Sequence, residues 1–359
     1  MSGTSPNTSP LPLEGIRVLE LASVLAGPLA GTDLAVRGAS VTKVERPPHG
    51  DVTRSWRTPS EPAVFDADGH PASAYWAAAN WGKTVAWVDL TTTAGAAWLE
   101  DALATHDVVI QNFKAADLAK FNLSPTDVSA RHPHLIHVRL VGFRHQPERL
   151  AYDVVVQAET GWMHMNGAPG SVPTRMPVAL MDVLASHAIR EAVLEGLYTR
   201  LRDGNNKGAY REISLESCGL AALANQATNH LIGGQSPGAS GNEHPNIAPY
   251  GDLLRCSDGH VVLAIGSNRQ FAALCEVLRL PEIATDPAYR TNAERVTHRS
   301  ALLDRLNAQS QGWKKSQLVD ALTAAGAPAG VVRTLPEVFQ AVSGAEVLLE
   351  DASGRRVAP

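Results

Sequence analysis

The sequence predicts an α/β protein with a large Rossmann-like domain followed by a smaller α+β domain. Three observations lead to this class. The chain has 359 residues, more than a single hydrophobic core usually serves. Its first half repeats a strand, helix, strand pattern. A stretch rich in Gly, Ser and Pro follows, with the sequence GGQSPGASGNEHPNIAPYG. The region after this stretch has the pattern of a hairpin followed by helices.

The first unit of the large domain is a βαβ motif. We expect a strand at GIRVLEL, a helix at LAGTDLAVRG that ends at Gly38, and a second strand at ASVTKVERP that stops at Pro47. Strands joined by such a short helical crossover pair in parallel. The pattern continues with strand KTVAWVDL, helix TAGAAWLEDALATH, and strands DVVIQNF and HLIHVRLVGF. We therefore expect one parallel sheet with helices on both faces.

A long helix is predicted after Asp182. Apolar residues at a spacing of four form one stripe along it, namely Ile189, Val193, Leu197 and Leu201. Strand GAYREISLES and helix CGLAALANQATNHLI complete the large domain, which we place at residues 1–225. A linker at 226–249, a small α+β domain at 250–335 and a C-terminal return segment at 336–359 follow.

Composition excludes several classes of function. The formal net charge is −5 and no run of Lys or Arg marks a nucleic-acid surface. Three scattered cysteines, Cys218, Cys256 and Cys275, are too few for a disulfide framework or a thiolate metal cage. The N-terminus lacks the features of a signal peptide, and no apolar run is long enough to cross a bilayer. We expect a cytoplasmic protein that binds neither nucleic acid nor membrane.

Common cofactor and metal motifs are missing. The first βα loop, ASVLAGPLAG, lacks the G-x-G-x-x-G turn, which argues against an NAD-dependent dehydrogenase. The histidines of RHPHLIH (His132, His134 and His137) alternate along a loop and strand without an evident carboxylate partner. We therefore expect no metal and no tightly bound cofactor.

Polar and aromatic residues gather instead at the predicted strand ends, where open α/β sheets bind ligands. These residues are Arg46, Lys83, Asn112, Phe113, Arg149, Tyr152, Asp153 and Asp182. Guanidinium and ammonium groups suit phosphates, and an aromatic ring suits a nucleotide base. The set predicts a site for an anionic ligand that carries adenine, with two carboxylates at the same edge.

Asp182 has two interpretations within its own window, MPVALMDVLAS. It stands where an apolar extended segment meets a helix, so its local environment predicts an N-cap. A carboxylate held ionised by a helix N-terminus is equally suited to act as a nucleophile. The window alone leaves both open.

Several motifs, in order along nearly the whole chain, resemble the family III CoA-transferases, a group that includes formyl-CoA and carnitine-CoA transferases and shares its superfamily with 2-methylacyl-CoA racemases. They are LPLEGIRVLELASVLAGPLAG, GASVTKVERPPHGDVTR, DVVIQNF, AYDVVVQAETGWMHMNG, MPVALMDVLAS, GNEHPNIAPYGDLLRCSDGHVVLAIGSNRQF, DPAYRTNAERVTHR and AAGAPAGVVRTLPEVF. The resemblance implies an interlocked, ring-like homodimer that uses coenzyme A or acyl-CoA as a substrate.

Position by position, the resemblance makes Asp182 the catalytic carboxylate. It implies that CoA is held by the first βα loop and by strand-end residues, namely Val24, Leu25, Ala26, Arg46, Val88, Asn112 and Phe113. Lys83 and Arg149 join this set as strand-end cations. The implied reaction moves CoA from an acyl-CoA to a free carboxylic acid through an aspartyl anhydride and an aspartyl-CoA thioester.

Tyr152 separates the two chemistries of the superfamily. Racemases of this group carry histidine there, which with the next aspartate supplies an acid and a base, whereas tyrosine is a poor base at neutral pH. We therefore predict transfer, with Tyr152 as a second catalytic residue and racemisation as the alternative. The loop GFRHQPERLAYD and the ending GRRVAP depart from the family pattern, and they motivate a third interpretation, a non-catalytic CoA-binding subunit.

Overall fold

The computed structural model describes residues 10–341, 347–350 and 356–357. Within these residues the chain forms two compact units. The larger comprises Met1–Trp162, Arg175–Gln235 and Val347–Pro359, and the smaller comprises Met163–Thr174 and Ser236–Glu346. The segment 163–174 thus belongs to the smaller unit, although it lies inside the range predicted for the large domain.

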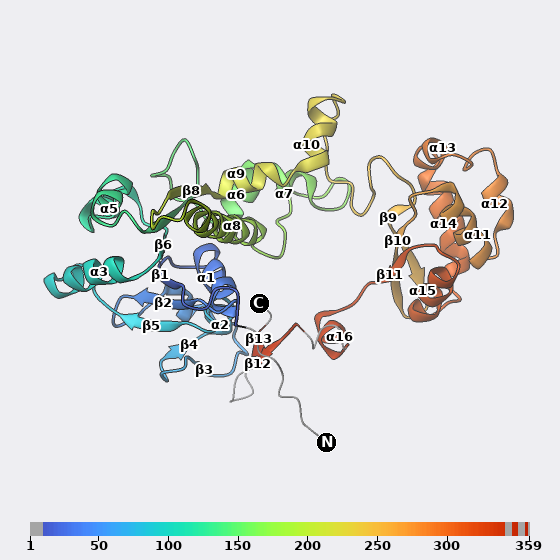
Figure 1. Ribbon diagram of the computed structural model, residues 1–359. Coiled ribbons are helices and arrows are strands. Elements are labelled where there is room, and N and C mark those ends of the chain that lie inside the picture. The colour runs from blue at the N-terminus through green and yellow to red at the C-terminus, as the bar shows by residue number, and fades with distance from the viewer. Residues whose placement is uncertain (1–9, 342–346, 351–355, 358–359) are drawn as a thin grey trace, which may run out of the picture. The chain divides into compact units, whose positions relative to one another are not determined.

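A six-stranded sheet forms the centre of the larger unit (Figure 1). Its order is β5-β2-β1-β6-β7-β8, and each neighbouring pair is parallel. The strands are β1 (Arg17–Leu21), β2 (Ser40–Glu45), β5 (Thr84–Trp87), β6 (Val108–Gln111), β7 (Ile136–Val141) and β8 (Tyr210–Ser214). The prediction of an α/β fold with a parallel sheet is confirmed. The order reverses direction between β1 and β6, and such a switch point opens a crevice at the carboxyl ends of the strands.

Helices cover both faces of this sheet because the strands bury alternate side chains on opposite faces. Val18 of β1 packs in one core with residues of α1 (Ala26–Val36) and α8 (Leu180–Asp203). The next residue, Leu19, packs in a second core with residues of α3, α4 and α5. The bounds of these helices are Thr93–Thr105, Ala115–Lys120 and Pro125–Arg131.

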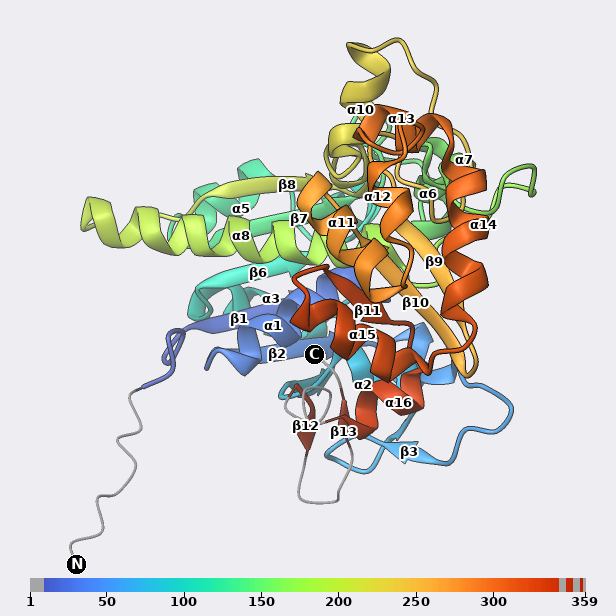
Figure 2. The same cartoon turned by 90° about the vertical axis from the view of Figure 1, so that its right-hand side faces the viewer.

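Helix α8 runs alongside β7 and β8 (Figure 2). Ile189 and Val193 of its predicted stripe are fully buried, whereas Leu201 is 80% exposed. The prediction that the stripe continues to Leu201 is therefore wrong. The last turn of α8 extends beyond the core, and its exposed leucine contributes nothing to the packing against the sheet.

An excursion between β2 and β5 was not predicted. It contains η1 (Val52–Ser55), β3 (Val64–Phe65), β4 (Pro71–Ala72) and α2 (Ala74–Ala79). Trp76 of α2 is buried in a small cluster against which Leu349 packs. The other elements of this unit and of the connections are α6 (Asp153–Glu159), α7 (Trp162–Met165), α9 (Leu215–Ala221), α10 (Ala224–Leu231), β12 (Leu349–Glu350) and β13 (Arg356–Val357).

The smaller unit contains a three-stranded antiparallel sheet in the order β11-β10-β9. Its strands are β9 (Tyr250–Cys256), β10 (Gly259–Ala264) and β11 (Ala329–Val331), and the pairing of β9 with β10 confirms the predicted hairpin. Its helices are α11 (Asn268–Val277), α12 (Pro281–Thr285), α13 (Asn292–Thr297), α14 (Arg299–Ser310), α15 (Lys315–Ala324) and α16 (Leu335–Gln340). Across the described parts of both units, no helix combines the length and apolarity needed to cross a membrane.

Candidate active site

Asp182 lies in the first turn of α8 but does not cap the helix. The helix begins at Leu180, and its N-cap residue, Ala179, makes no side-chain cap bond. The Met181 N–H donates instead to Oδ1 of Asp153, at 2.7 Å. The expectation that Asp182 caps the helix is therefore wrong, because the carboxylate of Asp153, from helix α6, accepts the hydrogen bond of the Met181 N–H at this end.

The environment of Asp182 makes it hard to ionise. Burial, and after it the negative charge of Asp153, raise the pKa of Asp182 from its ordinary value of 3.8 to about 7. The expectation that the helix N-terminus holds this acid charged is thus contradicted. A carboxyl with this pKa is present in both its protonated and its ionised form near neutral pH. A raised pKa also makes the ionised form a stronger nucleophile.

Asp153 is held firmly in its position. It is buried, and its Oδ2 accepts a hydrogen bond from Nε2 of Gln157. Oε1 of Gln157 accepts the Met176 N–H at 2.8 Å, which ties the segment before α8 to the same pair. Asp153 therefore links α6 to the start of α8 and brings a second carboxylate close to Asp182.

A cavity of about 280 Å³ surrounds Asp182 at the carboxyl edge of the sheet. Most of the predicted site residues line it: Val24, Leu25, Ala26, Asn112, Phe113, Arg149, Tyr152 and Asp182. The fold therefore brings together residues from β1–α1, β6–α4, the loop before α6, and α8. Tyr152, at the N-cap position of α6, is 55% exposed, so its hydroxyl is accessible to a ligand.

Arg149 also contributes to this cavity, but its charge is partly engaged. Its guanidinium lies over the Phe143 ring, 4.2 Å from the ring centroid, and pairs with both oxygens of Glu159. The hydrogen bonds that Arg149 donates to this carboxylate raise the pKa of Arg149 further above its ordinary value. The departure from the family pattern in GFRHQPERLAYD thus produces a cation that is held at the rim by a neighbouring acid.

A second cavity, of about 320 Å³, adjoins the first and shares Ser23, Phe113 and Asp117 with it. Two more predicted residues, Arg46 and Val88, line this cavity. The Arg46 side chain is 68% exposed and pairs with Asp89 at 3.2 Å. The open guanidinium is suited to a phosphate group that carries more charge than one carboxylate.

Lys120 and Phe121 line the second cavity as well, and the sequence did not point to them. The Lys120 ammonium lies 5.2 Å from the centroid of the Phe121 ring, which in turn packs against Phe113 at 5.3 Å. These residues stand at the end of a short helix, not at a strand end, so a search of strand ends misses them. They add a cation and a ring face to an anion-binding surface.

Lys83 lies away from both cavities. Its side chain is 0% exposed, and its Nζ lies 2.7 Å from Oε2 of Glu20. The same ammonium donates to the carbonyl oxygens of Pro28 and Ala79, each at 2.7 Å. Burial lowers the pKa of Lys83 to about 8, although Glu20 opposes the shift. This position contradicts the expected role in CoA binding and makes Lys83 a structural cation beneath the sheet edge.

Tyr75 is a candidate that the sequence did not reveal. It comes from α2, in the unpredicted excursion, and its ring lies edge-on to Trp56 with centroids 5.2 Å apart. Burial raises the pKa of Tyr75 to about 12, with further contributions from the charges of Asp182 and Asp153. Its phenol therefore stays protonated and lies within electrostatic reach of the carboxylate pair. No local pattern in SAYWAAA signals this, because the tertiary fold alone brings α2 to the site.

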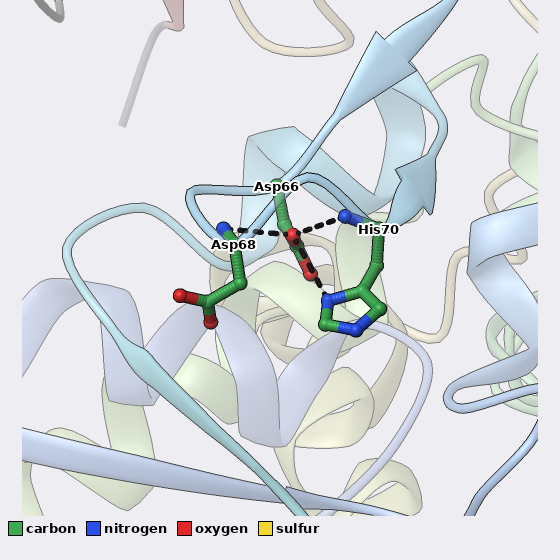
Figure 3. Close-up of side chains that lie close together, drawn as sticks. All are labelled: Asp66, Asp68 and His70. Carbon is green, nitrogen blue, oxygen red and sulfur yellow. Dashed lines mark hydrogen bonds and ion pairs between the residues drawn. The ribbon is translucent and has the colours of Figure 1, made fainter.

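Asp66, Asp68 and His70 form a close cluster in the β3–β4 turn (Figure 3). Oδ1 of Asp66 accepts the N–H groups of Asp68 and His70 at 3.0 and 2.8 Å, and Oδ2 pairs with Arg54 at 3.0 Å. The central carboxylate is thus satisfied by the turn and by a neighbouring cation. The arrangement is that of a hydrogen-bonded turn, and we assign no metal to it.

The three histidines of RHPHLIH have separate partners. Nε2 of His132 lies 2.9 Å from a carboxylate oxygen of Glu100, so the expectation that no acid accompanies them is wrong. Nε2 of His134 contacts the carbonyl of His106 at 3.1 Å. His137 is buried beside Gln111, and burial lowers its pKa to about 4. The three rings therefore do not converge on one site.

Comparisons with known proteins show the family of this chain. A family model described as CoA-transferase family III matches residues 13–347. A succinate–glutarate CoA-transferase of Agrobacterium fabrum is 39% identical over 338 residues, which cover 93% of this chain and 83% of that protein. A succinyl-CoA:glutarate CoA-transferase of Mus musculus is 34% identical over 340 residues, covering 94% and 75%. The crystal structure of a CaiB/BaiF family protein from Brucella suis aligns with a TM-score of 0.85 at 36% identity, covering 98% and 92% of the two chains.

Proposed function

The chain belongs to CoA-transferase family III, and we propose that it moves CoA from an acyl-CoA thioester to a free carboxylate with Asp182 as the nucleophile. One observation carries the assignment. Asp182 is a hard-to-ionise carboxylate in a cavity at the carboxyl edge of the sheet, beside the loop that contains Val24, Leu25 and Ala26. The adjoining cavity, with Arg46 and Lys120, supplies cations for the phosphates of CoA.

The reaction needs no oxidant and no net proton. An ionised Asp182 oxygen attacks the thioester carbonyl carbon, and the C–S bond breaks to leave an acyl–aspartyl anhydride and CoA thiolate. The thiolate then attacks the aspartyl carbonyl, which releases the donor acid and forms an aspartyl-CoA thioester. The acceptor carboxylate repeats these two steps in reverse order, and the free Asp182 carboxylate is regenerated.

One hydroxyl group in the cavity, that of Tyr152, is available to this chemistry. Tyr152 lines the cavity of Asp182 and presents an accessible phenol, which donates a hydrogen bond to the oxyanion that forms on the attacked carbonyl. Tyr75 lies within electrostatic reach of Asp182, and burial keeps its phenol protonated. Asp153 keeps the pKa of Asp182 high, and this raises the nucleophilicity of the ionised form.

Several relatives are named for short dicarboxylic acids. The relatives in Agrobacterium fabrum and Mus musculus are named for succinate or succinyl-CoA and glutarate, and one from Acetobacter aceti for acetyl-CoA and oxalate. We extend this class to the present chain, with succinyl-CoA as the donor and glutarate as the first acceptor to try. The finer expectations of a Rossmann-like CoA domain, an interlocked homodimer and a cytoplasmic location belong to the same proposal.

The test is CoA exchange from succinyl-CoA to glutarate, followed by mass spectrometry. The wild-type chain should form glutaryl-CoA, and Asp182→Ala should reduce the rate to background while the chain remains folded by circular dichroism. Near-full activity of Asp182→Ala would refute the assignment. Hydroxylamine trapping of the activated Asp182 carbonyl separates a catalyst from a non-catalytic CoA-binding subunit. Deuterium uptake at the α-carbon of a 2-methylacyl-CoA, without any acceptor, would identify the racemase alternative.

A further inference from the structure

The loop between β1 and α1 carries a strained backbone. Val24 has a φ of +73°, in the left-handed region. A β-branched residue rarely adopts that conformation, because its side chain crowds the backbone. Such a conformation persists only where the surroundings hold it, and it is commonest at functional sites. Val24 and the two residues after it line the cavity of Asp182.

Side chains from three separate parts of the chain hold this loop. The Val24 N–H donates to Oδ2 of Asp51 at 3.1 Å. Ser23 and Asn112 exchange two hydrogen bonds, at 3.2 and 3.1 Å. The ammonium of Lys43 donates to the carbonyl of Ala22 at 3.0 Å. Each of the three loop residues 22–24 is therefore fixed by a side chain that is distant in the sequence.

Asp51 is the residue whose side chain is hydrogen-bonded to the strained residue, Val24. Its side chain is 1% exposed, and its Oδ2 also pairs with Lys43 at 3.1 Å. Its Oδ1 accepts the N–H and the hydroxyl of Thr53, at 3.0 and 2.8 Å. Both oxygens are thus needed as acceptors, and an amide of the same shape has only one. The ammonium of Lys43 also pairs with Glu20 at 3.1 Å, and Glu20 pairs with Lys83 as well.

We propose that Asp51 is a positioning residue for CoA binding, which acts by holding Val24 in its left-handed conformation. The buried carboxylate fixes the Val24 amide, and the loop then presents residues 24–26 to the cavity beside Asp182. This inference rests on the proposed function, from which the CoA-binding role of the loop comes. Asp51 also lines the second cavity, but only 1% of its side chain is exposed, so we place its effect in the backbone of Val24.

A double-mutant cycle tests the proposal. Asp51→Asn should weaken CoA binding about tenfold by titration calorimetry, because one acceptor is replaced by a donor that opposes an N–H. In the Val24→Gly background the same change should cost less than about threefold, since glycine adopts a positive φ without support. The KM for acyl-CoA should follow the same pattern. A loss of equal size in both backgrounds would overturn the proposal.

Asp66→Asn is the matched control. Asp66 is a buried carboxylate that pairs with Arg54 in the same region but has no hydrogen bond to the loop. Its substitution should affect CoA affinity equally in the Val24 and Val24→Gly backgrounds. If Val24→Gly reduced the effect on CoA affinity equally for Asp51→Asn and Asp66→Asn, the effect would come from a general loss of stability. The positioning role of Asp51 would then be refuted.

Hydrogen exchange on the wild-type chain tests whether the Val24 N–H is bonded to Asp51, and it needs no variant. The Val24 amide should exchange slowly in the ligand-free protein, because its N–H is bonded to a buried carboxylate. Exchange at the intrinsic rate would refute the link between Asp51 and Val24. If the wild-type chain fails to bind CoA, the proposed function is refuted. The exchange rate of the Val24 amide tests its hydrogen bond to Asp51 independently of that result.

Discussion

The carboxylate of Asp153, and not that of Asp182, accepts the Met181 N–H at the start of α8, at 2.7 Å. Asp153 comes from α6 and is buried, so its charge acts on Asp182 through the protein interior. The carboxylate of Asp153 therefore accepts a hydrogen bond from the helix end, and the pKa of the neighbouring Asp182 is raised. This division of roles gives the proposed nucleophile, Asp182, a pKa of about 7.

Transferase activity should rise with pH through about 7, because only ionised Asp182 attacks the thioester. Asp153→Asn removes the neighbouring charge, so the midpoint of the pH–kcat/KM profile should move to lower pH, by about one unit. It should stay above the ordinary range of an aspartate, since burial is the larger cause of the shift. The measurement is the pH profile of CoA exchange at constant ionic strength.

Asp101→Asn is the control for this profile. Asp101 is exposed on α3, so the substitution removes one negative charge without changing the surroundings of Asp182. Its midpoint should match that of the wild-type chain. An unshifted midpoint in Asp153→Asn, or the same shift in both variants, would contradict the assigned coupling between the two carboxylates.

Asp182→Asn should stabilise the fold at pH 8 while it abolishes transfer. The pKa of Asp182 in the folded chain lies near 7, above its ordinary value of 3.8, so ionisation favours the unfolded state. The destabilisation begins as pH rises above about 4 and is complete above about 7. We expect the free energy of unfolding at pH 8 to increase by on the order of 1–3 kcal/mol. Denaturant titration measures it.

The same comparison at lower pH contains its own control. Near pH 4 the wild-type Asp182 is protonated in the fold and about 40% protonated in the unfolded chain, so the difference from Asp182→Asn should shrink to below about 1 kcal/mol. A stability gain that is equal at pH 4 and pH 8 would show that the side-chain amide acts by a contact other than relief of the buried charge.

Lys120→Gln should weaken the binding of CoA thioesters through the nucleotide half of the molecule. Lys120 lines the cavity that also contains Arg46 and Val88, and its loss removes one cation from an open surface. We expect the KM for succinyl-CoA to rise by roughly 3- to 10-fold at low salt, and by less at high salt. Steady-state kinetics at two ionic strengths test this.

Succinyl-pantetheine gives the matched comparison, because it keeps the thioester but lacks the nucleotide. Its KM should be equal for the wild-type chain and for Lys120→Gln. A loss of the same size with both thioesters would place Lys120 near the acyl end and would contradict the division into a nucleotide cavity and a cavity around Asp182.

The local patterns of the sequence determined the parallel α/β architecture, the small-unit hairpin and a strand-end candidate site that includes Asp182. Alternation and helical periodicity record which side of an element is buried, and the carboxyl ends of parallel strands share one edge, so these features follow from short stretches. The family resemblance, carried by many motifs along the chain, singled out Asp182 within that site, and the match to residues 13–347 confirms the family.

Only the tertiary structure decided what surrounds these residues. The sequence predicts the same role for Lys83 and Arg46. In the structure, however, Lys83 is buried against Glu20, whereas the Arg46 side chain is exposed and accessible to a ligand. Asp153 accepts a hydrogen bond at the start of α8 where Asp182 was expected to do so, and Tyr75 comes within electrostatic reach of both from an excursion that no pattern predicted. The partners of a side chain are set by elements distant in the sequence, and burial and neighbouring charge, which decide its pKa and its role, exist only once those elements pack together.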